Sequence, residues 1–374
     1  MDSIKTQMVV FVLFPIAYVL FVLWLIQGWN RLPFFSLNRN KEKFSIIIAV
    51  RNEAQTITAL LKSIAQQNYM KDDFEVIIVD DSSTDNTLLT IQQLDLKGDF
   101  KAVRLNDGEG KKAALSYGIT LSKYDIIITT DADCVVDENW LNSINDCYSN
   151  QKVSMAFGAV TFYEDVSFFE KIQTLEFASL VGAGAASLGQ KRATMCNGAN
   201  LSFKKEAFLR VGAYNGNQQI ASGDDEFLMH KLFAENSDQV VFNKSKAGIV
   251  KTKAAESFSQ FINQRKRWAS KWKHYQNSSP KILAPVVFFF NFYYLLLPLA
   301  YYFNLVTLEL FITGFAAKIT MDFIFISTVL RFLGKPIFIA HFLVLSLLYV
   351  FYVPLFGILG GLGNYTWKGR RIEG

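Results

Sequence analysis

The sequence predicts an α/β domain with a mostly parallel sheet, held between membrane helices. Three observations support this prediction. Long apolar runs flank a more polar middle region, short β-branched runs alternate with helix-like stretches in that region, and acidic residues follow the β-branched runs. The chain has 374 residues, 51% of them hydrophobic, and a formal net charge of +5. This length is enough for two ordinary domains.

Three long apolar runs contain no Asp, Glu, Lys or Arg and predict membrane helices: residues 8–29, 282–303 and 336–362. Each can cross a hydrocarbon layer of about 30 Å at about 1.5 Å per residue. Residues 8–29 are longer than the apolar core of a signal peptide, and no small-x-small cleavage site follows them. We therefore expect an anchor there and not a cleaved leader.

A fourth apolar segment, residues 305–330, is interrupted by Glu309, Lys318 and Asp322. Lys318 and Asp322 lie on one helical face and could neutralise each other in a bundle. Four crossings would place both chain ends outside, whereas the basic residues of the tail predict that it lies inside. Residues 305–330 are therefore the first candidate for an interfacial or re-entrant helix.

Basic residues near the first run predict its orientation. Only Lys5 precedes the run, while Arg31, Arg39, Lys41 and Lys43 follow it. Because positive charge stays inside, we expect the middle domain on the cytoplasmic side of a bacterial-type inner or plasma membrane. Basic segments next to a membrane also account for the net charge, so no nucleic-acid partner is required.

The middle region alternates expected strands with expected helices. The strands are residues 43–50, 73–81, 100–105 and 124–131, and the helices between them are residues 54–67, 84–94 and 111–122. Strands that alternate with helices of about three turns predict a parallel sheet covered on both faces. Ligands of such sheets bind beyond the carboxyl ends of the strands.

Acidic residues follow three of these strands, in the groups Glu53, then Asp80, Asp81 and Asp85, then Asp131 and Asp133. Carboxylates gathered at one edge would repel one another, and Mg²⁺ or Mn²⁺ would resolve the conflict because both accept carboxylate and phosphate oxygens. Asp85 alone is explained by a turn or a helix cap. Asp131 and Asp133, directly after an apolar strand, favour a metal site.

Other nucleotide-binding patterns fit less well. Residues 108–113, GEGKKA, match a dinucleotide fingerprint but follow the third strand instead of the first. Gly110-Lys111 lacks the upstream Gly and the following Ser or Thr of a Walker A loop. The histidines are too scattered for a zinc site. Lys111 could reach a diphosphate or be an exposed lysine in a first helical turn.

Seven motifs in register carry a family resemblance: SIIIAVRNEA, VDDSSTDNT, GKKAALSYGI, TDADC, NGANLSFKKEAF, SGDDEFL and QRKRW. In order and spacing they resemble the family 2 glycosyltransferases. More narrowly, they look like the membrane-bound branch with cellulose, chitin, hyaluronan and poly-N-acetylglucosamine synthases and ceramide glucosyltransferase. The resemblance covers roughly residues 44–275.

The resemblance implies a GT-A fold, a Rossmann-like α/β domain that binds a nucleotide-diphosphate sugar. It implies substrate-binding roles for Ala49, Glu53, Asp80, Asp81, Lys111, Asp131, Asn197, Gly198 and Asp224, and metal binding by Asp131 and Asp133. Asp225 matches the catalytic base, in a pair where the family usually has Glu-Asp. The catalytic Gln-x-x-Arg-Trp motif corresponds to Gln264, Arg267 and Trp268.

These expectations divide the chain into an anchor (1–30), a GT-A domain (31–253), an amphipathic interfacial helix with the Gln-x-x-Arg-Trp motif (254–280), a membrane region of two to three helices (281–363) and a basic tail (364–374). One carboxylate base and in-line attack predict inversion at the anomeric carbon. The expected donor is a UDP-sugar in preference to a GDP-sugar, and the small number of helices favours transfer to a lipid or lipid-linked saccharide. A processive polysaccharide synthase acting with a small membrane partner subunit, and a non-catalytic sugar-nucleotide-binding scaffold, are the alternatives.

Residues 264–275, QRKRWASKWKHY, are basic and aromatic. If they are helical, successive residues turn by about 100°, which sets two faces. One face would carry Gln264, Arg267, Trp268, Lys271 and Tyr275, and the other Lys266 and Lys273. We expect the first face to close the sugar-nucleotide site and the second to meet anionic lipid headgroups.

Overall fold

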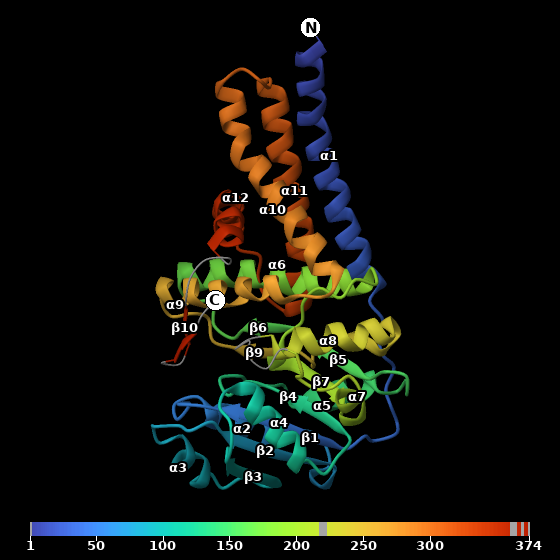
Figure 1. The fold of residues 1–374 in the computed structure, drawn as a ribbon, viewed down its shortest axis with the longest axis vertical. Helices are drawn as coiled ribbons and strands as arrows, with labels where there is room; N and C mark the ends of the chain where they lie inside the picture. Colours follow the sequence, from blue (N-terminus) through green and yellow to red (C-terminus); the bar gives the residue numbers. More distant parts are fainter. Residues whose placement is uncertain (1, 217–222, 360–364, 368–369, 373–374) are drawn as a thin grey trace.

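The computed structural model describes residues 2–216, 223–359, 365–367 and 370–372. Figure 1 shows an α/β domain from which three long helices extend together, with two helices lying across the junction. The extending helices are α1 (Asp2–Arg31), α10 (Ser278–Tyr302) and α11 (Leu308–Leu333), and those at the junction are α6 (Phe168–Gly189) and α9 (Phe258–Ser270).

The domain is built on a seven-stranded sheet of order β3-β2-β1-β4-β7-β5-β8. Its strands are β1 (Phe44–Val50), β2 (Phe74–Asp80), β3 (Asp99–Arg104), β4 (Ile126–Thr129), β5 (Met155–Gly158), β7 (Leu201–Lys204) and β8 (Val240–Asn243). Only β7 runs antiparallel to its neighbours, so the sheet is mostly parallel, as expected. Central strand residues such as Ile46, Ile47 and Ile48 are fully buried, as in a sheet covered on both faces.

Helices and a small second sheet complete the domain: α2 (Ile57–Ala65), α3 (Thr87–Gln92), α4 (Lys111–Leu121), α5 (Trp140–Cys147), α7 (Lys205–Arg210) and α8 (Asp224–Glu235), with β6 (Val160–Phe162) paired to β9 (Val250–Thr252). The four expected strands and three expected helices are all present. α2 begins three residues later than expected because the Glu53 carbonyl accepts the Thr56 and Ile57 amides in a preceding turn, at 3.0 Å each.

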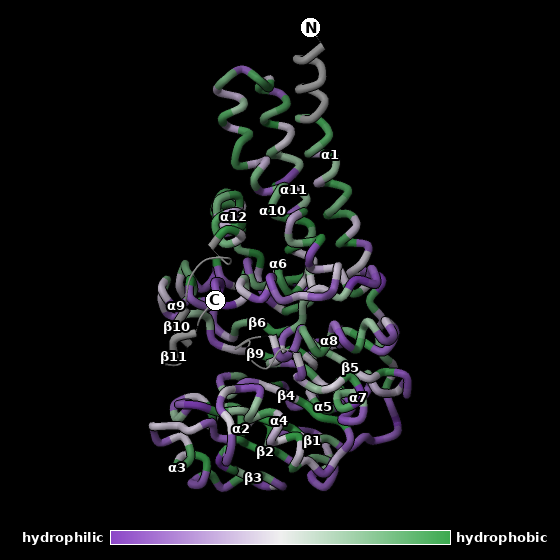
Figure 2. The backbone as a smooth tube through the Cα atoms, in the orientation of Figure 1, coloured by the Kyte–Doolittle hydropathy of each residue, from purple (hydrophilic) through white to green (hydrophobic). Residues whose placement is uncertain are grey.

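Four helices of the described chain are long and apolar enough to cross a membrane: α1, α10, α11 and α12 (Ile339–Leu359). Hydrophobic residues gather on them and along the strands (Figure 2). In Figure 1, α1, α10 and α11 run along one direction, whereas α12 is seen nearly end-on and so lies across them. α12 packs on α6, α9 and α10.

The helix that lies across is therefore α12, not the 305–330 segment that the sequence suggested. α11 stays beside α1 because its charges are satisfied: Lys318 Nζ lies 2.6 Å from Asp322 Oδ2, and the Tyr18 hydroxyl of α1 donates to the same carboxylate. The tail strands β10 (Tyr365–Trp367) and β11 (Arg370–Ile372) lie against α9, beside the α/β domain. An arrangement in which only α1, α10 and α11 run together, with the tail strands near the domain, is compatible with the basic charge of the tail.

α6 joins the membrane helices to the domain and was not expected from the sequence. It packs on α1, α11 and α12. Its crossing with α1 depends on glycine, because a Cβ at Gly189 would lie 2.0 Å from the Gly28 carbonyl oxygen. Gly182 allows a similar approach of α11, since a Cβ there would lie 2.5 Å from Val329 Cγ2. Small residues thus let the helices approach closely.

Candidate active site

A cavity of about 400 Å³ opens between the carboxyl ends of the strands and α9. One side, which we call the strand-end wall, consists of Ala49, Glu53, Asp81, Asp131 and Asp133. The opposite side, the α9 wall, consists of Gln260, Asn263, Gln264, Arg267 and Trp268. Lys111, Asn197, Gly198, Asp224 and Asp225 line the space between the walls. Of the residues expected to bind substrate or metal or to act in catalysis, Asp80 does not line the cavity, and neither does Tyr275 of the face expected to close it.

Parallel pairing explains why the strand-end wall forms. Val50 pairs with Asp80, so the ends of β1 and β2 are level. Asp81 then accepts a hydrogen bond from the Gly110 amide at 3.1 Å, which draws the start of α4 to the cavity. Asp80 is fully buried beneath this edge and accepts from the Ser83 amide at 3.3 Å. Its position fits support of the loop after β2 and not contact with a ligand in the cavity.

Asp85 makes the contacts of a turn residue just before α3, whose N-cap is Asn86. Its carboxylate accepts from the amides of Thr87, at 3.0 Å, and Ala54, at 3.2 Å. These bonds tie the start of α3 to the loop after β1. Asp85 thus fits the turn interpretation.

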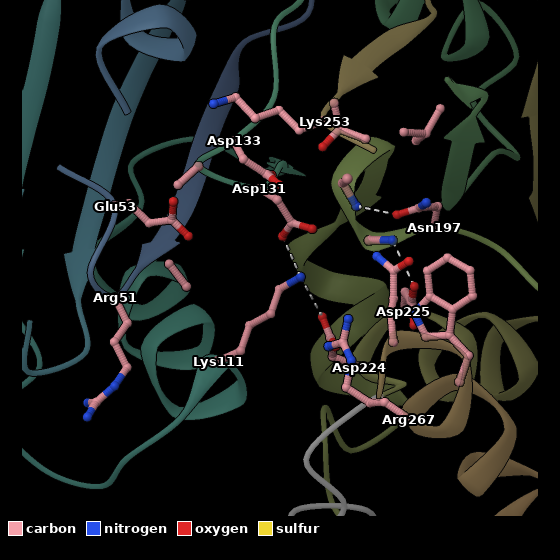
Figure 3. A pocket seen from close by; sticks show the side chains of 18 of the residues that line it. Arg51, Glu53, Lys111, Asp131, Asp133, Asn197, Asp224, Asp225, Lys253 and Arg267 are labelled. Atoms are coloured by element: carbon pink, nitrogen blue, oxygen red, sulfur yellow. Dashed lines mark hydrogen bonds and ion pairs between the residues drawn. The ribbon is translucent and has the colours of Figure 1, made fainter. Parts of the chain in front are cut away.

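Lys111 lies between two carboxylates, those of Asp131 and Asp224 (Figure 3). Its Nζ is 2.6 Å from Asp131 Oδ1 and 3.7 Å from Asp224 Oδ2. Burial alone would lower the pKa of Lys111, but these carboxylates outweigh burial and raise it above its ordinary value. Burial raises the pKa of Asp224, although Lys111 opposes the shift. A fixed ammonium in this position suits an anionic ligand.

Asp225 is held by backbone amides at the start of α8. Its Oδ2 accepts from the Gly198 amide at 2.7 Å and its Oδ1 from the Glu226 amide at 2.8 Å. Gly223, the residue before the helix, has φ of 80°, a left-handed conformation that glycine adopts readily. Asn197 caps the neighbouring turn through the Ala199 amide at 3.0 Å. The carboxylate is therefore fixed in orientation inside the cavity.

Asp131 and Asp133 reach the cavity from the loop after β4. Among the described residues, no group of three or more His, Cys, Asp or Glu side chains could hold a metal ion by itself. Two carboxylates are still a fitting donor set for Mg²⁺ or Mn²⁺, because such ions commonly complete their shell with phosphate oxygens and water. The site is thus suited to a cation that binds together with a diphosphate.

Helical spacing correctly predicts which residues of α9 line the cavity, up to the end of the helix. Gln264, Arg267 and Trp268 face the cavity, and Lys271 lines it as well. α9 ends at Ser270 and a 3₁₀ turn follows, so the spacing of about 100° does not extend to Tyr275. Trp268 stacks on Phe177 of α6, with ring centroids 5.8 Å apart.

Lys271 and Tyr275 instead support the residue next to Asp225. Lys271 Nζ lies 2.9 Å from Glu226 Oε2, and the Tyr275 hydroxyl donates to the same oxygen. These contacts join the segment after α9 to α8. Lys266 is half-buried and Lys273 is exposed, and neither lines the cavity.

Sequence reasoning missed several residues at the site. Arg51 and Lys253 line the cavity, and Glu176 and Arg265 lie behind the α9 wall. A signal for Glu176 existed, because it is the only charged residue in the apolar stretch 172–189. A charge in such a helix usually has a partner.

Comparison with known proteins agrees with the fold. Residues 45–212 match the family model described as Glycosyl transferase family 2. A poly-beta-1,6-N-acetyl-D-glucosamine synthase of Staphylococcus epidermidis is 32% identical over 192 residues, which are 50% of this chain and 46% of that protein. The protein of the same name from Staphylococcus aureus strain COL is 32% identical over 176 residues, 46% of this chain and 42% of that protein. The chain spans about half the length of the curated relatives it matches.

A solved structure gives the same fold. It is the mannosyltransferase PcManGT from Pyrobaculum calidifontis in complex with GDP-Man and Mn²⁺, with a TM-score of 0.56 and 17% identity. The match covers 95% of this chain and 97% of that one. The α/β domain thus has the GT-A fold, and the chain contains a family 2 glycosyltransferase domain.

Proposed function

We propose that the chain is a metal-dependent inverting glycosyltransferase that moves a sugar from a UDP-sugar to an acceptor hydroxyl at a membrane surface. The observation that carries this proposal is the composition of one cavity. The Asp131 and Asp133 carboxylates, the Lys111 ammonium and the fixed Asp225 carboxylate all line it. Departure of a nucleoside diphosphate and deprotonation of an acceptor need these groups.

The strand-end wall takes the nucleotide in this proposal. Asp81, with Ala49 and Glu53 beside it, contacts the base and ribose. Asp131 and Asp133 would hold Mg²⁺ or Mn²⁺, and the bound ion would offset the charge that develops on the leaving diphosphate. Lys111, fixed between Asp131 and Asp224, acts on the same charge. Arg267 approaches the diphosphate from the α9 wall.

Asp225 is the base in this proposal. Its two backbone hydrogen bonds orient the carboxylate without involving another side chain. As the acceptor oxygen attacks the anomeric carbon, Asp225 takes the hydroxyl proton while the bond to the diphosphate breaks. A single displacement of this kind inverts the configuration at the anomeric carbon. Asn197, Gly198 and Trp268 line the acceptor side.

The relatives favour a saccharide acceptor and make UDP-N-acetylglucosamine the first donor to test. The two staphylococcal relatives are named as poly-beta-1,6-N-acetyl-D-glucosamine synthases. The stacked rings of Trp268 and Phe177 give the cavity an aromatic side, which suits the apolar face of a sugar ring. We therefore propose extension of a saccharide, in which a small membrane partner subunit could take part. Transfer to a lipid acceptor is the second candidate. With basic residues after α1, we propose that the domain faces the cytoplasm.

Turnover by the purified full chain in lipid nanodiscs tests the function. The protein is incubated with Mn²⁺, lipid extract, short saccharides and each of several labelled UDP- and GDP-sugars, and the products are identified by mass spectrometry. We expect release of UDP with a product of inverted configuration. Absence of turnover with every donor would contradict the proposal and favour a non-catalytic sugar-nucleotide-binding scaffold.

A further inference from the structure

A buried ion pair holds α9 on α6 behind the active-site wall. Arg265 of α9 donates through Nε to Glu176 Oε1 at 2.9 Å, and through Nη2 to the second carboxylate oxygen. The side chains are only 3% and 2% exposed. The fork of the guanidinium thus meets the two oxygens of one carboxylate, the most directional contact that two charged side chains make.

The same guanidinium orients two residues of the α9 wall. Its Nη1 donates to Gln264 Oε1, and its Cζ lies 4.2 Å from the centroid of the Trp268 ring. Because arginine only donates, it selects the oxygen end of the Gln264 amide. The Nε2 group of Gln264 therefore remains available to the cavity. Its protons can be donated to an oxygen of a sugar or a diphosphate.

α12 contributes the third member of this cluster. The Tyr352 hydroxyl donates to Glu176 Oε1 at 2.9 Å, across 176 positions of sequence. A second hydroxyl of α12, that of Tyr349, lies 2.8 Å from Ser179 Oγ on α6. α6, α9 and α12 therefore meet at one carboxylate, and the last of these helices belongs to the membrane region.

Stability alone does not explain a buried pair of this kind. Two charges lose their hydration on burial, and well-packed apolar residues of similar volume often stabilise a protein as much or more. The better-attested role of such pairs is to select one register between helices. A slip of α9 by one residue would rotate the helix by about 100°. Arg265 would then leave Glu176, and Gln264, Arg267 and Trp268 would turn away from the cavity.

We propose that Glu176, Arg265 and Tyr352 are positioning residues: they fix the register of the α9 wall and make it depend on α12 being docked on α6. This inference rests on the proposed function for its kinetic effect, because the α9 wall acts on the reaction only if transfer occurs in this cavity. Its structural part, the ordering of α9 by α12, stands independently.

Two mild substitutions test the cluster, because removal of one whole charge could unfold the chain. Tyr352→Phe removes one hydroxyl that bonds to Glu176, and Arg265→Lys keeps the charge but loses the fork. Tyr349→Phe is the matched control, since it removes a hydroxyl from the same helix that bonds to neutral Ser179. All are made in the full chain in lipid nanodiscs.

Hydrogen exchange and kinetics are measured on the same samples. We expect Tyr352→Phe and Arg265→Lys to speed amide exchange across α9 and to lower kcat, by about 10-fold and about 100-fold. The affinity for UDP changes less than kcat, because the strand-end wall supplies the contacts to the base and ribose. Tyr349→Phe changes neither exchange nor kcat.

Unchanged exchange across α9 in both variants would overturn the inference, as would an equal effect of Tyr349→Phe. Wild-type rates in Arg265→Lys would overturn the role of the fork. If wild-type protein shows no turnover, the proposed function fails, but the exchange measurement still decides whether α12 orders α9.

Discussion

The two walls of the cavity are built from different kinds of structure. The strand-end wall extends from a sheet whose central strands are fully buried, and its loops are fixed by hydrogen bonds to neighbouring loops. The α9 wall is a single helix held from behind by one carboxylate and two aromatic rings of α6, those of Phe169 and Phe177. A change in the first wall should therefore remove chemistry while leaving the structure intact, whereas a change behind the second should alter alignment.

The largest effect is expected at the carboxylate between the walls. Asp225→Asn keeps the size of the side chain but removes the base, so we expect kcat to fall by about 10³-fold. UDP release from the most active donor measures this, with UDP affinity as the control for an intact strand-end wall. A loss of less than tenfold would assign proton transfer to another group.

Metal removal tests the strand-end wall. Chelation by EDTA should lower turnover by at least about 100-fold, because neither Lys111 nor Arg267 alone offsets the charge of a departing diphosphate. Titration with Mn²⁺ and Mg²⁺ should restore activity in wild type but not in Asp131→Asn. Full activity in EDTA would show that the cation has no role.

Arg267→Ala tests the α9 wall directly. Loss of one cationic donor aimed at the leaving group should lower kcat by about 100-fold, with the thermal unfolding temperature of the chain unchanged. Unfolding at a lower temperature would mean that Arg267 supports the structure instead.

A smaller effect is expected on stability at low pH. Burial lowers the pKa of His230 on α8 to about 4, from an ordinary value of 6.5. Between pH 6.5 and 4, His230 therefore binds a proton in the unfolded chain but not in the folded chain. Stability is complete above pH 6.5 and is lost toward pH 4, by on the order of 3 kcal/mol. Thermal unfolding in nanodiscs should show this slope in wild type and less of it in His230→Gln; equal slopes would place the titrating group elsewhere.

The smallest effect is expected on the face of α9 and the following turn that does not line the cavity. Lys266→Gln with Lys273→Gln should leave kcat unchanged and weaken contact with anionic lipid by at most about 2 kcal/mol, while the membrane helices keep the chain attached. The matched comparison is Arg267→Ala. This variant also removes positive charge, but from a residue that lines the cavity. Equal kinetic losses from both would contradict the division of the two faces.

The two walls also differ in how far the sequence predicts them. Asp81, Asp131 and Asp133 follow β-branched runs directly, so local pattern and parallel pairing suffice to bring them together. The α9 wall depends on contacts that no local pattern contains: Glu176 lies 89 positions from Arg265 and 176 from Tyr352. α6 itself has no clear apolar period, because it packs on membrane helices α1, α11 and α12 and also on β6 and β8 of the domain.

The membrane region shows the same limit. Length and composition mark α10, α11 and α12 as equivalent, yet α12 lies across the others and packs on α6 and α9, where its Tyr352 hydroxyl bonds to Glu176. Lys318 and Asp322 made 305–330 resemble an interfacial segment, whereas their mutual ion pair allows α11 to stay within the bundle.

A structure of the full chain with UDP and Mn²⁺ tests the central claim most directly. We predict Mn²⁺ on Asp131 and Asp133, the uracil beside Asp81, and the diphosphate between Lys111 and Arg267, so that both walls contact one ligand. Density for UDP outside this cavity, or Mn²⁺ bound without Asp131 and Asp133, would contradict the account.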